Sequence, residues 1–138
     1  MNVKDLMSTN VAHTTPETGT KEAAHQMHEL HVGVLPVLDD GKLVGMITDR
    51  DICCKVIAIG HSAGRTQVSE IMSTDVATCF DDQNIGDATD MMIKNHVRRL
   101  AVVNHDNTVV GLLSIDDLAK NSHDMAGSVL EATMQKAH

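Results

Sequence analysis

The pattern of apolar and polar positions predicts one structural unit that occurs twice along the chain. In the first copy, one helical stripe is formed by side chains spaced i, i+3, i+7 and i+10, namely Thr20, Ala23, Met27 and Leu30. Two apolar runs follow, at residues 34–38 and 43–47, and the turn between them contains Gly41. Apolar runs on either side of such a turn are typical of a β-hairpin, and a second helix is expected over residues 49–59.

The second copy starts 65 residues later, where the segment 3–12 returns as the segment 68–77. A short helical lead-in and a brief extended piece begin each copy. The predicted order of the unit is therefore strand, helix, strand, strand, helix. We expect repeat 1 over residues 1–59, a linker over 60–67, repeat 2 over 68–120 and a tail over 121–138. Within the tail, residues 128–137 form either a short amphipathic helix or a frayed end.

Chain length favours one shared core over two independent domains. The 138 residues have the size of one ordinary domain, whereas a single copy of about 60 residues would be marginal alone. We therefore expect an α+β fold in which two pseudo-symmetric repeats pack through their small sheets. Paired clefts between the repeats are then the expected place for function.

Charge and composition exclude some classes of partner. The formal net charge is -8, which opposes broad binding to the phosphate backbone of nucleic acids. A small anionic ligand still suits a local pair of cations, and the adjacent Arg98 and Arg99 are the best candidates. Phe80 is the only Phe, Tyr or Trp residue, so a bound nucleobase would lie between aliphatic side chains and backbone.

Features of a membrane or secreted protein are missing from the sequence. No stretch of 18 apolar residues predicts a membrane span, and the first residues lack the apolar core of a signal peptide. The three cysteines do not make an even set for disulfides. The expected location is the cytoplasm, with reduced thiols.

A hydroxyl and a carboxylate recur where each hairpin runs into its helix. Thr48 precedes Asp51 by three residues, and Ser114 precedes Asp117 by the same spacing. Such pairs form capping boxes at helix starts. They also suit a nucleoside phosphate, because the hydroxyl stands beside free N–H groups and the carboxylate can accept the hydroxyls of a ribose. Recurrence at equivalent points of a duplicated unit strengthens the second interpretation.

The segments 37–39, 45–52 and 111–118 resemble a known family, because their order, their spacing and both hairpin-end motifs agree with it. The chain resembles a tandem cystathionine-β-synthase (CBS) domain pair, or Bateman module, over about residues 1–120. We expect no attached enzyme or transporter, and the chain is in this respect similar to the small stand-alone bacterial pairs of the hypoxic response protein type. The resemblance implies a regulatory sensor without catalytic activity that binds AMP, ADP, ATP, S-adenosylmethionine or NAD. It also implies a homodimer and leaves room for an unknown regulated protein.

The resemblance further implies the residues of two clefts. One would contain Thr48, Asp51, Thr74, Val97 and Arg98. The other would contain Ser114, Asp117, Arg98, Arg99, Lys4, Thr9, Val32 and Gly33. In both, the aspartates would hold ribose, the hydroxyls and arginines would face phosphate, and the base would be flanked by Met7, Met72, Val32 and Val97. Since Gly33 and Val34 stand where the second copy has the arginines, a phosphorylated ligand should favour the clefts that the arginines reach.

Other interpretations remain open beside this one. A metal- or redox-responsive stress protein would use the histidines at i, i+3 and i+6, which are His25, His28 and His31, or the adjacent cysteines, Cys53 and Cys54. Against a metal site, no cysteine or carboxylate stands beside these histidines at a recognised zinc spacing. The sequence also lacks a nucleophile–base–acid arrangement, a Walker loop and a Gly-x-Gly-x-x-Gly motif, so we expect neither an enzyme nor a required cofactor.

Overall fold

The computed structural model describes residues 1–134 and divides the chain into two compact units. The first-hairpin unit is Ala12–Val76, and the second-hairpin unit combines Met1–Val11 with the chain from Ala77 onward. Each unit contains helices and one small antiparallel or mixed sheet, which confirms the predicted α+β class. The two units are described one after the other.

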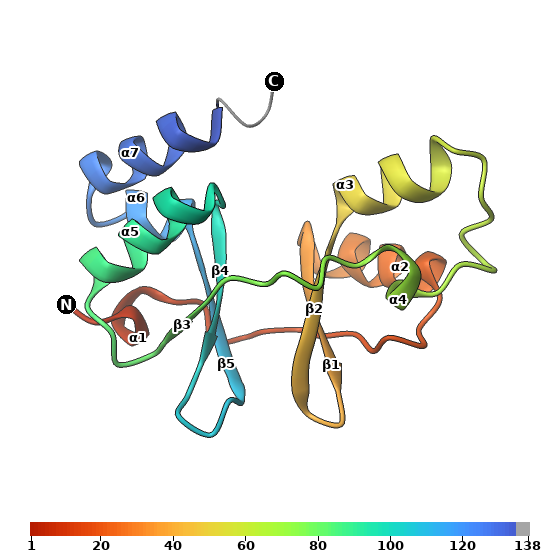
Figure 1. Cartoon of the computed structure of the whole chain (residues 1–138), viewed down its shortest axis with the longest axis horizontal. Helices are drawn as coiled ribbons and strands as arrows, with labels where there is room; N and C mark the ends of the chain where they lie inside the picture. Colours follow the sequence, from red (N-terminus) through yellow and green to blue (C-terminus); the bar gives the residue numbers. More distant parts are fainter. Residues whose placement is uncertain (135–138) are drawn as a thin grey trace. The chain divides into compact units, whose positions relative to one another are not determined.

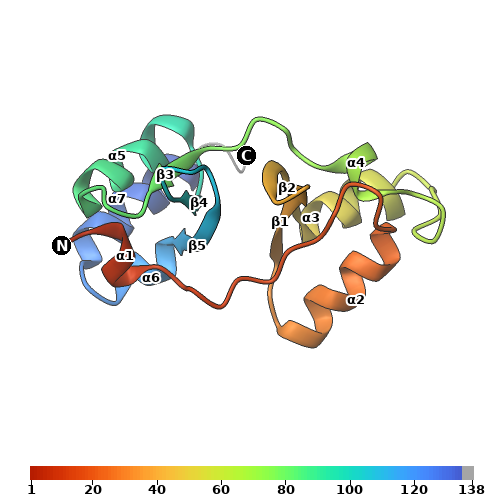
Figure 2. The ribbon, with the colours of Figure 1, turned by 90° about the horizontal axis from the view of Figure 1, so that it is seen from below.

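The first-hairpin unit is built on a two-stranded antiparallel hairpin with helices against it (Figure 2). Its elements are α2 (Thr20–Leu30), β1 (Val34–Asp39), β2 (Lys42–Thr48), α3 (Asp49–Ile52), the π-helix η1 (Cys53–Ile57) and α4 (Val68–Ile71). Asp40 and Gly41 both have positive φ, at 53° and 79°, as the tight turns of two-residue hairpins require. The predicted hairpin and both predicted helices are confirmed, with the second helix continuing from α3 into η1.

The extended piece that begins the first copy is shorter than its counterpart. Thr14 makes only an isolated parallel bridge to Val37, so no strand forms there. In the second copy, the corresponding strand β3 (Thr78–Phe80) pairs in parallel with the next strand over three residues. The first sheet therefore has two strands and the second has three.

The second-hairpin unit has a three-stranded sheet in the order β3-β4-β5 (Figure 1). Besides β3 it contains α1 (Val3–Leu6), α5 (Ile85–Asn95), β4 (Arg99–Val103), β5 (Val109–Ser114), α6 (Ile115–Ala119) and α7 (His123–Met134). Leu100, Val102 and Leu113 are fully buried between the sheet and its helices. The alternation of buried and half-buried positions along β5 fits a strand with one face on this core.

Residues 123–134 of the tail form α7, which packs against α5 and α6 (Figure 1). Ala126, Val129 and Thr133 are its buried residues, and their spacing of three and four lays them on one face. The helix begins five residues before the predicted start at Ser128. The end of the predicted tail helix, residues 135–137, lies outside the described residues.

The leading segments of the two copies are exchanged between the units. α1 begins the first copy, yet it belongs to the second-hairpin unit, where the Val3 N–H donates to the Gln83 carbonyl at 2.9 Å. α4 begins the second copy, yet the Val68 N–H donates to the Thr18 carbonyl of the first-hairpin unit at 2.8 Å. Val3 and Val68 are both fully buried. The compact units therefore do not coincide with the repeats of the sequence.

Candidate functional site

A capping box joins Thr48 and Asp51 at the start of α3. The Thr48 hydroxyl accepts a hydrogen bond from the Asp51 N–H at 3.1 Å, and the Asp51 Oδ2 accepts one from the Thr48 N–H at 2.9 Å. The other carboxylate oxygen, Oδ1, lies 3.1 Å from the Lys55 ammonium. The predicted capping role is confirmed, and one Asp51 oxygen remains outside the box.

Ser114 and Asp117 repeat this arrangement at the start of α6. Asp117 Oδ2 accepts from the Ser114 N–H at 2.9 Å and from the Ser114 hydroxyl at 3.1 Å. The Lys120 ammonium lies 3.9 Å from Asp117 Oδ1, and 75% of the Lys120 side chain is exposed. Asp117 itself is buried, whereas Asp51 is half-buried. Charge on the more buried carboxylate is screened less by water, so Asp117 offers the stronger local field.

A glycine in each hairpin lets the exchanged leading segment approach the strand. A Cβ on Gly45 would lie 2.6 Å from the Met72 sulfur and 2.9 Å from the Ser73 carbonyl oxygen. A Cβ on Gly111 would lie 2.6 Å from the Met7 sulfur and 2.8 Å from the Ser8 carbonyl oxygen. The absence of a side chain thus admits both segments at van der Waals distance.

These close approaches decide where two of the expected site residues lie. Ser73 bridges Met46 in β2, which brings the adjoining Thr74 into the unit that contains Thr48 and Asp51. Ser8 bridges Leu112 in β5, which brings Thr9 into the unit that contains Ser114 and Asp117. In this way, a residue from the start of one copy joins the hairpin of the other.

Two arginines lie beside the second capping box. Arg99 is paired with Ser114 across the ladder of β4 and β5, and the Ile115 N–H donates to the Arg98 carbonyl at 3.0 Å. Both arginines are exposed, and neither makes an ion pair within residues 1–134. Instead, Arg98 Nε donates to the Thr133 hydroxyl of α7 at 2.8 Å. Within the described residues, neither arginine side chain is therefore neutralised by a neighbouring carboxylate.

The remaining expected residues are spread over both units. Val97 is half-buried against the core of the second-hairpin unit. Lys4 is exposed on α1, where its N–H donates to the Asp81 carbonyl at 2.9 Å. Val32 and Gly33 belong to the first-hairpin unit, and the Gly33 carbonyl accepts from the Asp49 N–H at 2.9 Å.

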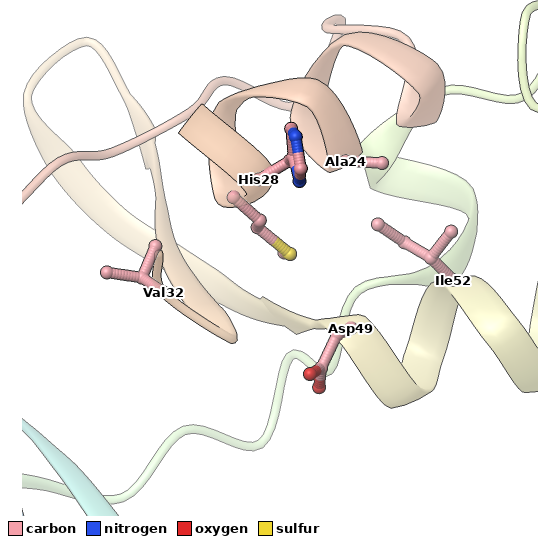
Figure 3. A pocket seen from close by; sticks show the side chains of 6 residues that line it. Ala24, His28, Val32, Asp49 and Ile52 are labelled. Carbon is pink, nitrogen blue, oxygen red and sulfur yellow. The ribbon is translucent and has the colours of Figure 1, made fainter. Parts of the chain in front are cut away.

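A cavity of about 280 Å³ opens in the first-hairpin unit between α2 and α3 (Figure 3). It is lined by Ala24, Met27, His28, Val32, Asp49 and Ile52. The carboxylate of Asp49 is one of its few polar groups, and a Cβ on Gly33 would lie 3.0 Å from Asp49 Oδ2. The position that carries Arg98 in the second copy is thus held in the first copy by a glycine beside an acid.

Sequence reasoning missed three residues of these sites. Lys55 pairs with Asp51, and their i, i+4 spacing on one helix was a signal that could have found the pair. Asp49 reaches the cavity from the first position of α3, directly beside the recognised motif. Thr133 contacts Arg98, which lies 35 residues earlier in the sequence, and no local sequence pattern predicts such a contact.

The histidines and cysteines of the described chain are spread over both units. Within residues 1–134, no group of three or more His, Cys, Asp or Glu side chains is arranged to hold a metal ion. Cys53 and Cys54 are exposed, and burial raises the pKa of the Cys79 thiol to about 11. None of the helices in the same part of the chain has both the length and the apolar character that a bilayer crossing needs.

Comparison with known sequences gives two matches to one family model, described as the CBS domain, at residues 3–57 and 68–124. The chain is also similar to a "CBS domain-containing protein YhcV" of Bacillus subtilis (strain 168). The two are 42% identical over 130 residues, which cover 93% of this chain and 91% of that protein.

Solved structures give the same pattern of similarity. Hypoxic Response Protein I (HRPI), in a crystal structure with two coordinated zinc ions, matches with a TM-score of 0.79 and 28% identity. That match covers 88% of this chain and 99% of HRPI. The CBS domain pair of protein MJ0100, in complex with 5′-methylthioadenosine and S-adenosyl-L-methionine, matches with a TM-score of 0.78 and 29% identity. It covers 87% of this chain and 94% of that pair.

Proposed function

Because this chain belongs to the CBS domain family, as its hairpin-end motifs predicted, we propose that it is a regulatory module that binds an adenosyl ligand. The MJ0100 pair, which is similar in fold and sequence, was crystallised with two adenosyl compounds. The hydroxyl and carboxylate at the end of each hairpin are the groups of this chain that suit such a ligand. Ligand binding, rather than catalysis, is the activity we assign.

The carboxylates carry the proposal. In each capping box one oxygen, Oδ2, accepts the backbone N–H. Among residues 1–134, the polar contact of the other oxygen, Oδ1, is with a lysine ammonium, at 3.1 Å for Asp51 and 3.9 Å for Asp117. We assign these Oδ1 atoms to the paired hydroxyls of a ribose. The box fixes each carboxylate in advance, so little side-chain freedom is lost on binding.

Phosphate recognition is assigned to the side that has the cations. Ser114 lies opposite Arg99 on the sheet, and Arg98 adjoins the first residue of α6. A charge-assisted contact from an arginine to a phosphate is stronger than a neutral one. We therefore expect the second repeat to bind AMP, ADP, ATP or NAD more tightly than the first repeat does.

Regulation follows from a ligand that binds two conformations with different affinity. Such a ligand shifts the population toward the form it prefers, and a protein that recognises that form then reads the ligand's concentration. We expect the responding species to be a homodimer and its target to be another, still unidentified protein. S-adenosylmethionine is the natural competitor to test beside the nucleotides.

Calorimetric titration of the whole chain tests the proposal. The variant Asp117→Asn keeps the shape of the side chain and an acceptor for Ser114, but it removes the charge offered to ribose. We expect it to weaken the tighter nucleotide-binding event about tenfold or more. Asp116→Asn is the matched control, because Asp116 is an exposed neighbour in the first turn of α6.

Two results would contradict the proposed function. If Asp117→Asn and the double variant Asp51→Asn/Asp117→Asn both bind nucleotide as tightly as the wild type, these carboxylates do not bind ribose. A thermal-shift panel adds the wider test, since a ligand that binds only the folded form raises its stability. Stabilisation by zinc alone, with no response to any adenosyl compound, would favour the metal-responsive alternative instead.

A further inference from the structure

The side chain of Arg98 is attached to the C-terminal helix. Its Nε donates to the Thr133 hydroxyl at 2.8 Å, and Thr133 is only 5% exposed. Arg98 itself is exposed. A cation at the protein surface thus has one of its N–H groups fixed on a buried oxygen.

The oxygen that holds Arg98 is itself fixed. The Thr133 hydroxyl lies 3.0 Å from the Val129 carbonyl and 3.1 Å from the Leu130 carbonyl, so its own proton points back along α7. Its lone pairs are therefore left for the guanidinium. A second link lies one residue away, where His96 Nδ1 is 3.4 Å from the Ala132 carbonyl. The last turn of α7 is in this way tied to the turn that ends α5.

The geometry of the contact leaves the phosphate-binding end of the arginine available. A guanidinium has five N–H groups in a rigid plane, and two terminal nitrogens carry four of them. Within residues 1–134, the Thr133 contact through Nε is the one hydrogen bond of the Arg98 side chain. The two terminal nitrogens therefore have no acceptor in the described chain, and the Thr133 contact restrains the direction of the guanidinium.

We infer that Thr133 is a positioning residue, which holds the Arg98 guanidinium for the phosphate of a nucleotide bound at Ser114 and Asp117. The inference rests on the proposed function and adds to it the residue that positions the phosphate-binding cation. Arg98 adjoins that site through its backbone, since its carbonyl accepts from the Ile115 N–H at 3.0 Å. An arginine held beforehand loses less freedom when it binds, so more of its attraction for phosphate appears as affinity.

The first repeat has no arginine at the position equivalent to Arg98. Gly33 takes the place of Arg98 there, and the Asp49 carboxylate lies close by. The described elements of the first-hairpin unit include no counterpart of α7, and its helices border the open cavity of Figure 3. The Asp49 carboxylate would repel a phosphate at this point, whereas it would not repel an uncharged nucleoside.

The test compares ATP with adenosine, because only ATP offers phosphates to Arg98. In the 138-residue chain, Thr133→Val removes the hydroxyl at nearly constant volume, and Thr133→Ser keeps it. We expect Thr133→Val to weaken ATP binding about three- to tenfold and to leave adenosine binding unchanged. Thr133→Ser should bind both like the wild type. In an Arg98→Ala background, Thr133→Val should cause no further loss, since Thr133 acts through Arg98.

Two results would overturn the inference. One is an equal loss of ATP and adenosine affinity in Thr133→Val, which is what a merely structural role of α7 would cause. The other is full additivity of Thr133→Val and Arg98→Ala. Absence of binding by every adenosyl compound in the wild type would instead overturn the proposed function, so the two failures are distinguishable.

A measurement on the wild type covers the case in which Thr133→Val does not fold. The Nε–H signal of Arg98 in an NMR spectrum of the labelled protein should shift on titration with ATP and stay in place with adenosine. A signal that ATP binding leaves unmoved would contradict the assigned role of Arg98 and, with it, that of Thr133.

Discussion

Gly111 should be among the positions of this chain least tolerant of a single methyl group. A Cβ there would lie 2.6 Å from the Met7 sulfur and 2.8 Å from the Ser8 carbonyl oxygen. The sulfur ends a flexible side chain and can move aside, but the carbonyl belongs to the backbone. Ser8 and Leu112 exchange two hydrogen bonds, at 2.9 and 3.0 Å, so moving the carbonyl disturbs both of them. Gly111→Ala therefore acts on the contact that holds the exchanged segment in place.

The expected loss of folding stability is the sum of two contributions, the disturbed hydrogen bonds and the steric strain. Two backbone hydrogen bonds contribute about 1 kcal/mol each to folding stability. The strain of an extra methyl group in a packed site costs about 1–3 kcal/mol when neighbours cannot move freely. The hydrogen bonds and the strain together amount to about 3–5 kcal/mol. Because the neighbouring groups can relax in part, we expect Gly111→Ala to lower the free energy of unfolding by about 3 kcal/mol.

Urea denaturation followed by circular dichroism measures this loss. Gly127→Ala is the matched control, because Gly127 is an exposed glycine of α7 whose added Cβ would meet nothing within 4 Å. Alanine there should raise the stability by about 0.5–1 kcal/mol through helix propensity. Gly45→Ala should resemble Gly111→Ala, since its Cβ would lie 2.9 Å from the Ser73 carbonyl oxygen. A Gly111→Ala protein as stable as Gly127→Ala would refute the reasoning.

Two further predictions concern side chains that titrate. The hydrogen bond from His105 to Asp82, at 2.7 Å, raises the pKa of His105 above its ordinary 6.5 and lowers that of Asp82 below 3.8. The pair therefore contributes its full stabilisation between about pH 4 and 6.5 and loses it as pH rises through the raised pKa of His105 or falls through the lowered pKa of Asp82. NMR titration should show the His105 value return toward 6.5 in Asp82→Asn, and an unchanged value would contradict this cause. With a thiol reagent at pH 8, Cys53 and Cys54 should react quickly and Cys79 slowly, because Cys79 is buried and its pKa is about 11; equal rates for all three thiols would count against its burial.

Local features of the fold were predictable because their causes are local. The Asp40–Gly41 turn, the two apolar runs beside it and the helical stripe of α2 lie within a few residues of the groups that determine them. Both capping boxes were also readable, since a hydroxyl and a carboxylate three residues apart satisfy each other's backbone N–H groups.

Features that depend on distant partners were not predictable in the same way. The first copy contains an extended piece like that of the second, yet only Thr14 pairs there. The sequence repeat divides the chain before α4, but the Val68 side chain is buried with residues of the first hairpin. A repeat pattern identifies equivalent elements, and it does not say which hairpin each element packs against.

In the candidate site too, the local motifs were predictable and the contacts between distant residues were not. Thr48, Asp51, Ser114 and Asp117 stood out because a duplicated spacing is visible in one sequence. The tie between Arg98 and Thr133 depends on where α7 docks, and docking is decided by burial of Ala126 and Val129 rather than by any local motif. The ligand-facing roles of the other expected residues stay predictions.

The division at residues 11/12 and 76/77 has a consequence for how the chain is made. Ala12–Val76 is continuous, so it can complete its core as soon as it has left the ribosome. Met1–Val11 is synthesised before Ala12–Val76, yet it must wait until the strands that follow Ala77 emerge, and only then can Val3 and Met7 leave water. A segment made before the first-hairpin unit is thus buried only after that unit is complete, and its apolar side chains stay exposed to water during the delay.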